Sequence, residues 1–236
     1  MQHRTDNYSS ASCNQMRNGE LHMIHVKFCG IRRIEDIEAV NRLRPDLAGF
    51  VFAKSQRQIT KEQAAALKEL LDPGIKTVAV LVNMPAEEAA VLANSGIADL
   101  LQLHGDEDAA YIAKLRTLTQ VKIIKAIRLQ GTETDNTLMK EAEQTDFYLF
   151  DTFVADIYGG TGKTFSLSLL KGVQIEKPFF LAGGLDAGNV PEVIRQVQED
   201  ARLFPYFYGV DVSGGIETDG VKDPIKMEAF IKAIRR

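Results

Sequence analysis

Tryptophan is absent from the 236-residue sequence, and cysteine occurs only twice, at Cys13 and Cys29. Two cysteines are too few for the disulfide frameworks of small secreted domains, so we expect a cytoplasmic protein. No run approaches the roughly 18 consecutive apolar residues that a membrane-spanning helix requires. Positive charge is not in excess, because the net charge is −4. These features argue against membrane and nucleic-acid partners and favour a small-molecule ligand.

The first 22 residues are polar and lack the apolar core of a secretory signal. We interpret residues 1–22 as a flexible N-terminal extension and expect the folded part to begin at Met23. No linker or low-complexity stretch interrupts residues 23–236. One large α/β domain is therefore expected over that range.

Short apolar runs rich in β-branched and aromatic residues alternate with stretches of helical periodicity. Most of the short runs are apolar throughout, as expected of parallel strands buried on both faces. Thr60 and Gln63 form a capping-box pattern at the start of one predicted helix. The predicted strands are residues 24–28, 47–52, 77–82, 99–103, 121–127, 147–151, 179–182 and 208–212. The predicted helices lie near residues 34–43, 61–71, 86–95, 107–118, 134–144, 166–171, 189–198 and 223–235.

Eight strand-then-helix units predict an α/β fold, a single-domain (β/α)8 TIM barrel, although such barrels typically use about 250 residues. An open doubly wound sheet is the alternative that the same alternation allows. The active sites of barrels lie at the carboxyl ends of the strands. The functional residues are therefore expected just after each predicted strand.

The stretch YGGTGKT, residues 158–164, resembles a phosphate-binding Walker loop. That loop requires a glycine five residues before the Gly-Lys-Thr, and Ile157 stands there instead. A Walker loop also follows its strand directly, whereas the predicted strand 147–151 ends several residues earlier. We therefore do not interpret this stretch as an ATP site.

Two residues at predicted strand ends are candidates for acid–base chemistry. Cys29 lies two residues after Lys27, so both side chains project to one side of the strand. A nearby ammonium group is expected to lower the pKa of the thiol and make it a useful base, although many cysteines are simply buried apolar residues. Asp151 ends the apolar run FYLF, where burial is expected to raise its pKa and favour a general acid. A helix-capping or turn role for Asp151 is the alternative.

Glycine pairs follow the seventh and eighth predicted strands, in LAGGL (181–185) and VSGGIE (212–217). These two loops commonly bind phosphate in barrels, because residues without a Cβ let backbone N–H groups come close. Ordinary turn glycines are the alternative. We predict a phosphate site formed by Gly183, Gly184, Ser213, Gly214 and Gly215.

Three further polar residues at strand ends are predicted to bind substrate: Arg57, His104 and Asp211. The planar guanidinium of Arg57 suits a substrate carboxylate, unless it is a solvated surface charge. His104 precedes two acidic residues in LQLHGDE, but no second histidine has the spacing of a zinc site, so a hydrogen-bonding or structural histidine is preferred to a metal ligand. No metal is therefore predicted.

Together the motifs resemble one family, the phosphoribosylanthranilate isomerases of tryptophan biosynthesis. The resemblance runs from about Met23 to the C-terminus, and the order and spacing of the motifs make it specific. The matching stretches are VKFCGI (26–31), GFVF with SQRQI (49–52 and 55–59), LLQLHGDE (100–107), VKIIKAIR (121–128), LFDT with GGTGKTF (149–152 and 159–165), FFLAGGL (179–185) and GVDVSGGIE (209–217).

The resemblance implies a cofactor-free (β/α)8 barrel that catalyses an Amadori rearrangement of N-(5-phosphoribosyl)anthranilate. It implies Cys29 as general base, Asp151 as general acid and Arg57 as partner of the anthranilate carboxylate. It also implies that residues 158–164 form the sixth loop, which helps to enclose the substrate, while the role of Lys163 stays open. A monomer or a homodimer would be compatible with it.

The chain departs from the family pattern at several positions. Ser213-Gly214-Gly215 replaces the usual Ser-Ser-Gly, and Gln56 replaces a proline before Arg57. Arg32 and Arg33 stand where a threonine and a small polar residue are usual, and residues 201–210 are longer than usual. These departures bear on substrate affinity more than on the catalytic groups.

Two other barrel functions are the alternatives. The histidine-pathway sugar isomerase has an aspartate where Cys29 stands and takes a substrate with two phosphates. A barrel that binds a sugar phosphate without catalysis would not need both an acid and a base.

Overall fold

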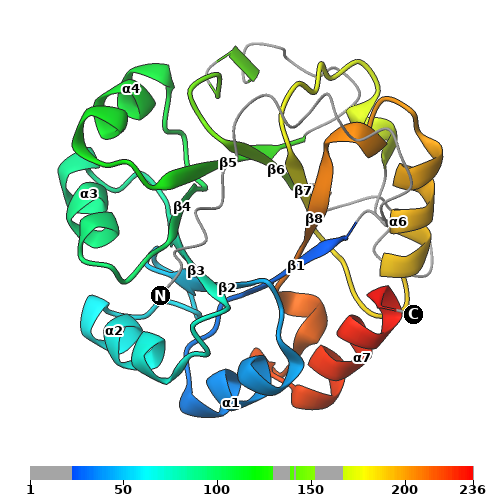
Figure 1. Ribbon diagram of the computed structural model, residues 1–236, viewed down its shortest axis with the longest axis horizontal. Helices are drawn as coiled ribbons and strands as arrows, with labels where there is room; N and C mark the ends of the chain where they lie inside the picture. The colour runs from blue at the N-terminus through cyan, green and yellow to red at the C-terminus, as the bar shows by residue number, and fades with distance from the viewer. Residues whose placement is uncertain (1–22, 130–138, 141, 152–166, 236) are drawn as a thin grey trace, which may run out of the picture.

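The computed structural model describes residues 23–129, 139–140, 142–151 and 167–235. Within them, eight parallel strands form a closed ring in which each strand pairs with the next and β8 pairs with β1. Helices surround this ring on the outside (Figure 1). The prediction of a (β/α)8 barrel is confirmed, and closure between β1 and β8 excludes the open doubly wound sheet.

The strands agree with the predicted ones to within one residue at each end. They are β1 (His25–Cys29), β2 (Leu47–Val51), β3 (Lys76–Leu81), β4 (Leu100–Leu103), β5 (Lys122–Arg128), β6 (Phe147–Asp151), β7 (Phe179–Ala182) and β8 (Phe207–Val212). The α-helices are α1 (Ile34–Leu43), α2 (Lys61–Leu70), α3 (Ala86–Asn94), α4 (Ala109–Leu118), α6 (Val190–Glu199) and α7 (Pro224–Ile234). Among the described helices, none is long and apolar enough to cross a membrane.

Several elements differ from the predictions. The segment expected to be helical at 166–171 forms a short 3-10 helix, η2 (Leu167–Leu170). Most of the helix predicted at 134–144 lies outside the described residues, as do the loop 158–164 and the extension 1–22. Further elements were not predicted: the 3-10 helices η3 (Phe204–Tyr206) and η4 (Gly214–Ile216), and a small hairpin of β9 (Glu217–Thr218) and β10 (Val221–Lys222).

Local capping explains where the helices begin. Thr60 accepts a hydrogen bond from the amide of Gln63, and the Gln63 side chain accepts one from the amide of Thr60, so the predicted capping box is present. The Asp223 side chain caps α7 by accepting from the amides of Ile225 and Lys226. Pro224 follows as the first helical residue, where its missing N–H is not needed.

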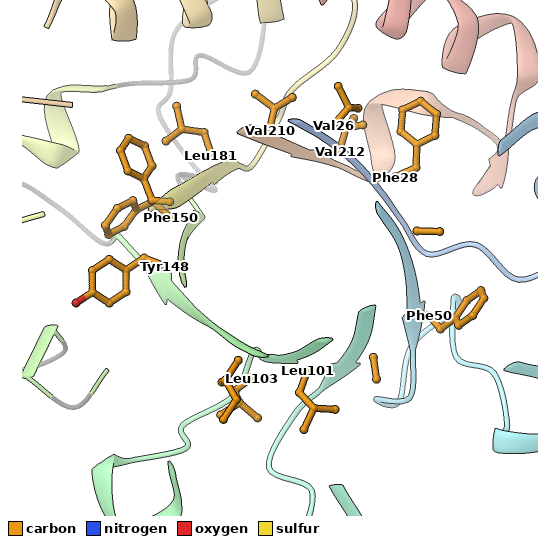
Figure 2. Close-up of a cluster of buried hydrophobic side chains, with 14 of the residues drawn as sticks. Val26, Phe28, Phe50, Leu101, Leu103, Tyr148, Phe150, Leu181, Val210 and Val212 are labelled. Atoms are coloured by element: carbon orange, nitrogen blue, oxygen red, sulfur yellow. The ribbon is translucent and has the colours of Figure 1, made fainter. Parts of the chain in front are cut away.

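Apolar side chains fill two separate regions, one inside the strand ring and one between the ring and the helices. The outer region includes Phe28, Phe50 and Phe150, which project away from the barrel axis (Figure 2). The inner region includes the buried side chains of Leu149 and Phe180, which belong to a separate cluster. Strands covered on both faces therefore carry nearly continuous apolar sequences.

Candidate active site

An ion pair lies within the strand ring directly below the carboxyl end of β1. The ammonium group of Lys27 is fully buried and donates to Oδ1 of Asp211 at 2.9 Å. Strand register places Lys27 opposite Asp211, and Cys29 opposite Gly49. A Cβ built on Gly49 would lie 3.2 Å from both the Cys29 sulfur and the Lys27 nitrogen. The thiol and the ammonium group are therefore near neighbours inside the barrel, as the strand alternation predicted.

The pKa of the Cys29 thiol differs from the expectation based on Lys27 alone. Burial raises this pKa above its ordinary value of 9.0, and the charge of Asp211 raises it further. Lys27 and Lys222 act in the opposite direction but do not outweigh burial. The prediction of a lowered thiol pKa was wrong because the Lys27 charge is already matched by Asp211 and the thiolate would lose its hydration.

Asp151, at the carboxyl end of β6, lies beside His104. Nε2 of His104 is 3.7 Å from Oδ2 of Asp151, and each side chain is 24% exposed. Nδ1 of His104 lies 2.8 Å from the amide nitrogen of Gln102, a fully buried residue of β4. If this amide donates, the His104 proton sits on Nε2 and faces the Asp151 carboxylate. Arg128 also donates to the His104 carbonyl at 2.7 Å.

Arg57, in the loop after β2, is held by a carboxylate. Its Nε and Nη2 donate to the two oxygens of Glu217 at 2.8 and 2.6 Å, which is a bidentate fork. Burial would raise the pKa of Glu217, but hydrogen bonds from Arg57 and Lys222 outweigh burial and lower it to about 2. Glu217 therefore stays ionised at neutral pH.

Lys222 connects this fork to the loop after β8. Its buried ammonium group donates to Oε1 of Glu217 at 2.6 Å and to the carbonyl oxygen of Ser213 at 3.0 Å. The hydroxyl of Ser213 donates in turn to the carbonyl oxygen of Cys29 at 3.0 Å. One network of contacts thus joins the loops after β1, β2 and β8.

The two glycine loops predicted to bind phosphate lie against each other. Gly183 and Gly184 have φ of +96° and +66°, a conformation that side chains disfavour. A Cβ on Gly215 would lie only 1.9 Å from the carbonyl oxygen of Leu185. Glycine at these positions is therefore required by the backbone, whichever ligand the loops bind.

The acidic residues after His104 have structural partners. Glu107 is buried and binds the ammonium group of Lys125 at 2.9 Å. The Asp106 carboxylate accepts from the Asn83 side chain at 3.2 Å. Within the described ranges, no cluster of three or more His, Cys, Asp or Glu side chains is arranged to hold a metal ion.

Sequence reasoning missed Glu217 and Lys222, although one signal could have found them. Asp219-Gly220 lies between them, and Asp-Gly is the strongest short-range signal for a tight β-hairpin. Recognition of that turn would have placed Glu217 directly opposite Lys222, as the register of β9 and β10 does. Gln102, which contacts His104, was not predicted as a site residue either.

Comparison with known proteins gives a consistent result. The family model for N-(5'-phosphoribosyl)anthranilate (PRA) isomerase matches residues 26–233. The chain belongs to this family. It is 49% identical to the N-(5'-phosphoribosyl)anthranilate isomerase of Thermoanaerobacter sp. (strain X514) over 213 residues, covering 90% of this chain and 98% of that one.

Solved structures of the family agree with this assignment. The phosphoribosyl anthranilate isomerase of Thermotoga maritima is 32% identical, with a TM-score of 0.73 over 90% of this chain and 99% of that one. That organism's enzyme is described as dimeric. Another isomerase, 29% identical with a TM-score of 0.71 over 90% of this chain and 99% of that one, was solved with reduced 1-(o-carboxyphenylamino)-1-deoxyribulose 5-phosphate.

The family assignment fixes the reaction. The enzyme converts phosphoribosylanthranilate to 1-(2-carboxyphenylamino)-1-deoxyribulose 5-phosphate in tryptophan biosynthesis, as the sequence motifs predicted.

The Lys27–Asp211 pair yields a prediction about stability. Lys27→Met should lower the free energy of unfolding by about 3–5 kcal/mol, because it leaves a buried carboxylate without its cation. The double variant Lys27→Met/Asp211→Asn should recover much of that loss. Urea unfolding at neutral pH measures both. A double variant less stable than Lys27→Met would contradict the explanation.

Proposed function

We propose that Cys29 is the general base and Asp151 the general acid of the isomerisation. The two residues stand at the carboxyl ends of β1 and β6 in the closed barrel, where catalytic groups of barrels are found. The observation that carries the proposal is the buried thiol of Cys29 beside the Lys27 ammonium group, each 3.2 Å from a Cβ built on Gly49. The charges of Lys27 and Lys222 both favour its thiolate form.

The proposed reaction has two proton transfers. Asp151 protonates the ring oxygen of the ribose, so that the ring carbon–oxygen bond breaks and an iminium ion forms at C1′. The Cys29 thiolate then removes the C2′ proton, and the C–H electron pair moves to neutralise the iminium. The resulting enolamine tautomerises to the ketone product.

The substrate has an anionic group at each end, and the barrel mouth offers a partner for each. Arg57 would bind the anthranilate carboxylate, and the backbone amides of Gly183, Gly184, Ser213, Gly214 and Gly215 would bind the phosphate. The solved relative's ligand carries the same two groups, which supports a site with a partner for each of them.

His104 and Asp211 have more specific proposed roles. His104 lies beside Asp151 and would contact the ribose while supporting the acid. Asp211 was proposed as a direct substrate contact, and its place beneath Cys29 means that it also holds Lys27 near the thiol. No cofactor is required by this chemistry.

We further propose a cytoplasmic enzyme that works as a monomer or a homodimer. The dimeric relative from Thermotoga maritima supports the second state. Residues 1–22 are proposed to be an extension outside the catalytic domain, since the family model begins only at residue 26.

Removal of either proton-transfer group should nearly abolish turnover. Cys29→Ala and Asp151→Asn should each lower kcat by at least about 10²–10⁴-fold, the usual contribution of general acid–base catalysis. Consumption of freshly generated phosphoribosylanthranilate, followed by its fluorescence, measures this, with circular dichroism as the control for folding. Near-normal kcat in a folded variant would remove that residue from the mechanism.

The raised pKa of Cys29 predicts the pH dependence. The active form needs a protonated Asp151 and a deprotonated Cys29. When the thiol has the higher pKa, the population of that form is constant between the two pKa values and falls below the pKa of Asp151 and above the pKa of the thiol. The alkaline limb of kcat/KM should therefore lie above the ordinary thiol value of 9.0.

Alkylation of the enzyme tests the same pKa directly. In a Cys13→Ser variant, Cys29 is the single thiol, so the rate of iodoacetamide modification against pH reports its ionisation. A midpoint near neutral pH would show that the lysines outweigh burial.

Substitution of the proposed carboxylate partner should mainly weaken binding. Arg57→Ala should raise KM by about 10–100-fold, the loss expected for hydrogen bonds between charged groups. The kcat should change little, because the contact is the same in the ground and transition states. A large fall in kcat at unchanged KM would argue for a role in the chemical step instead.

A further inference from the structure

The hairpin of β9 and β10 has a defined turn. Its central residues, Asp219 and Gly220, have φ of +51° and +74°, as a type I′ turn requires. This turn fixes Glu217 directly opposite Lys222 on the neighbouring strand. The pair is nearly inaccessible to solvent, with side-chain exposures of 6% and 1%. Glu217 is therefore presented from a short, rigid element rather than from a flexible loop.

The Arg57 side chain is confined both at its stem and at its guanidinium end. A Cβ on Gly30 would lie 2.6 Å from Cδ of Arg57, so the arginine stem runs close over the backbone just after Cys29. The guanidinium end is then fixed by the two bonds to Glu217. These contacts use Nε and one hydrogen of Nη2, and the guanidinium carries five N–H groups in total. Donors therefore remain for a second carboxylate.

The hairpin also holds the loop that carries Arg57. Arg32 donates to the backbone carbonyl of Gln56 at 2.7 Å and to that of Gly220 at 3.1 Å. Arg32 and Gln56, two residues at which the chain departs from the family pattern, are therefore in direct contact. Arg32 thus attaches the loop in which Gln56 replaces the usual proline to the hairpin.

The charges of this cluster explain why the Glu217 carboxylate does not prevent Arg57 from attracting an anionic substrate. Arg57 and Glu217 alone would form a neutral pair with little attraction for an anion. Lys222 adds a positive charge through its 2.6 Å contact with Glu217, so the three side chains together carry a net charge of +1. The cluster remains attractive to a carboxylate while its geometry is fixed.

We propose that Glu217 is a positioning residue that holds Arg57 in place for the substrate carboxylate, and that Lys222 anchors Glu217 to the loop after β8. The proposal rests on the proposed role of Arg57. Lys222 contacts the Ser213 carbonyl and Arg57 contacts Glu217, so the sites for the two anionic ends of the substrate are held relative to each other. Binding then requires less ordering of a long side chain.

The test is a double-mutant cycle on KM. Glu217→Gln should raise KM for phosphoribosylanthranilate by about tenfold with little change in kcat, because only the ordering of Arg57 is lost. In the Arg57→Ala background, Glu217→Gln should have no further effect on KM. Inhibition by inorganic phosphate should be unchanged in Glu217→Gln, because phosphate binds at the glycine loops.

The chain offers a closely matched control. Glu192 forms the same bidentate fork with Arg195 at 2.8 and 2.6 Å, but on the exposed surface of α6. Glu192→Gln should leave KM and kcat at wild-type values. Thermal unfolding verifies that each variant is folded, and Glu217→Asp, which keeps the charge, replaces Glu217→Gln if the latter does not fold.

The outcomes separate the two proposals. If Arg57→Ala leaves KM unchanged, the proposed role of Arg57 fails. If Arg57→Ala raises KM but Glu217→Gln does not, or if the two effects simply add, the positioning role of Glu217 is wrong while the role of Arg57 stands.

Discussion

Pairing between β1 and β8 is the constraint on which the rest of this enzyme depends. It joins the first and last strands of the barrel and brings Lys27 within 2.9 Å of Asp211, 184 residues later in the chain. An isolated charge in this apolar interior would be strongly unfavourable, so the charges of Lys27 and Asp211 must compensate each other. The same closure places the loop after β8 next to the loop after β1. The network from Ser213 through Lys222 to Arg57 can form only because the ring is closed.

Two sets of charged groups among the described residues at and below the barrel mouth are already paired before substrate arrives. Lys27 is matched by Asp211, and Glu217 by Arg57 and Lys222. Partnered charges need little reorganisation when an anion binds, which is the usual way in which a site is preorganised. Because Lys27 and Lys222 are already paired with carboxylates, they stabilise the Cys29 thiolate only in part. Burial, reinforced by the charge of Asp211, therefore keeps the pKa of the thiol high in the free enzyme.

Much of the fold could be predicted from the sequence, because each strand is a compact apolar run and each helix has its own periodicity. The strand boundaries, and with them the locations of Cys29, Asp151 and the glycine loops, follow from local pattern alone. Contacts between residues that are far apart in the sequence cannot be predicted from local pattern. The fork between Arg57 and Glu217 spans 160 residues, and nothing in either local sequence indicates the other. The prediction of a lowered thiol pKa failed because burial in the closed barrel, together with the charge of Asp211 at the other end of the chain, outweighs the effect of Lys27.

The raised thiol pKa also bears on the order of the proposed steps. In the free enzyme, burial opposes formation of the Cys29 thiolate, and the nearby lysines only partly compensate. In the proposed mechanism, protonation of the ribose by Asp151 creates an iminium cation within the substrate. That cation makes the C2′ proton more acidic and, as a new positive charge in a site of low dielectric, stabilises a thiolate nearby. Acid catalysis therefore prepares both partners of the second proton transfer. A base with a high pKa is compatible with the reaction when the acid acts first, and the strongly basic thiolate then has a large driving force for removing the C2′ proton.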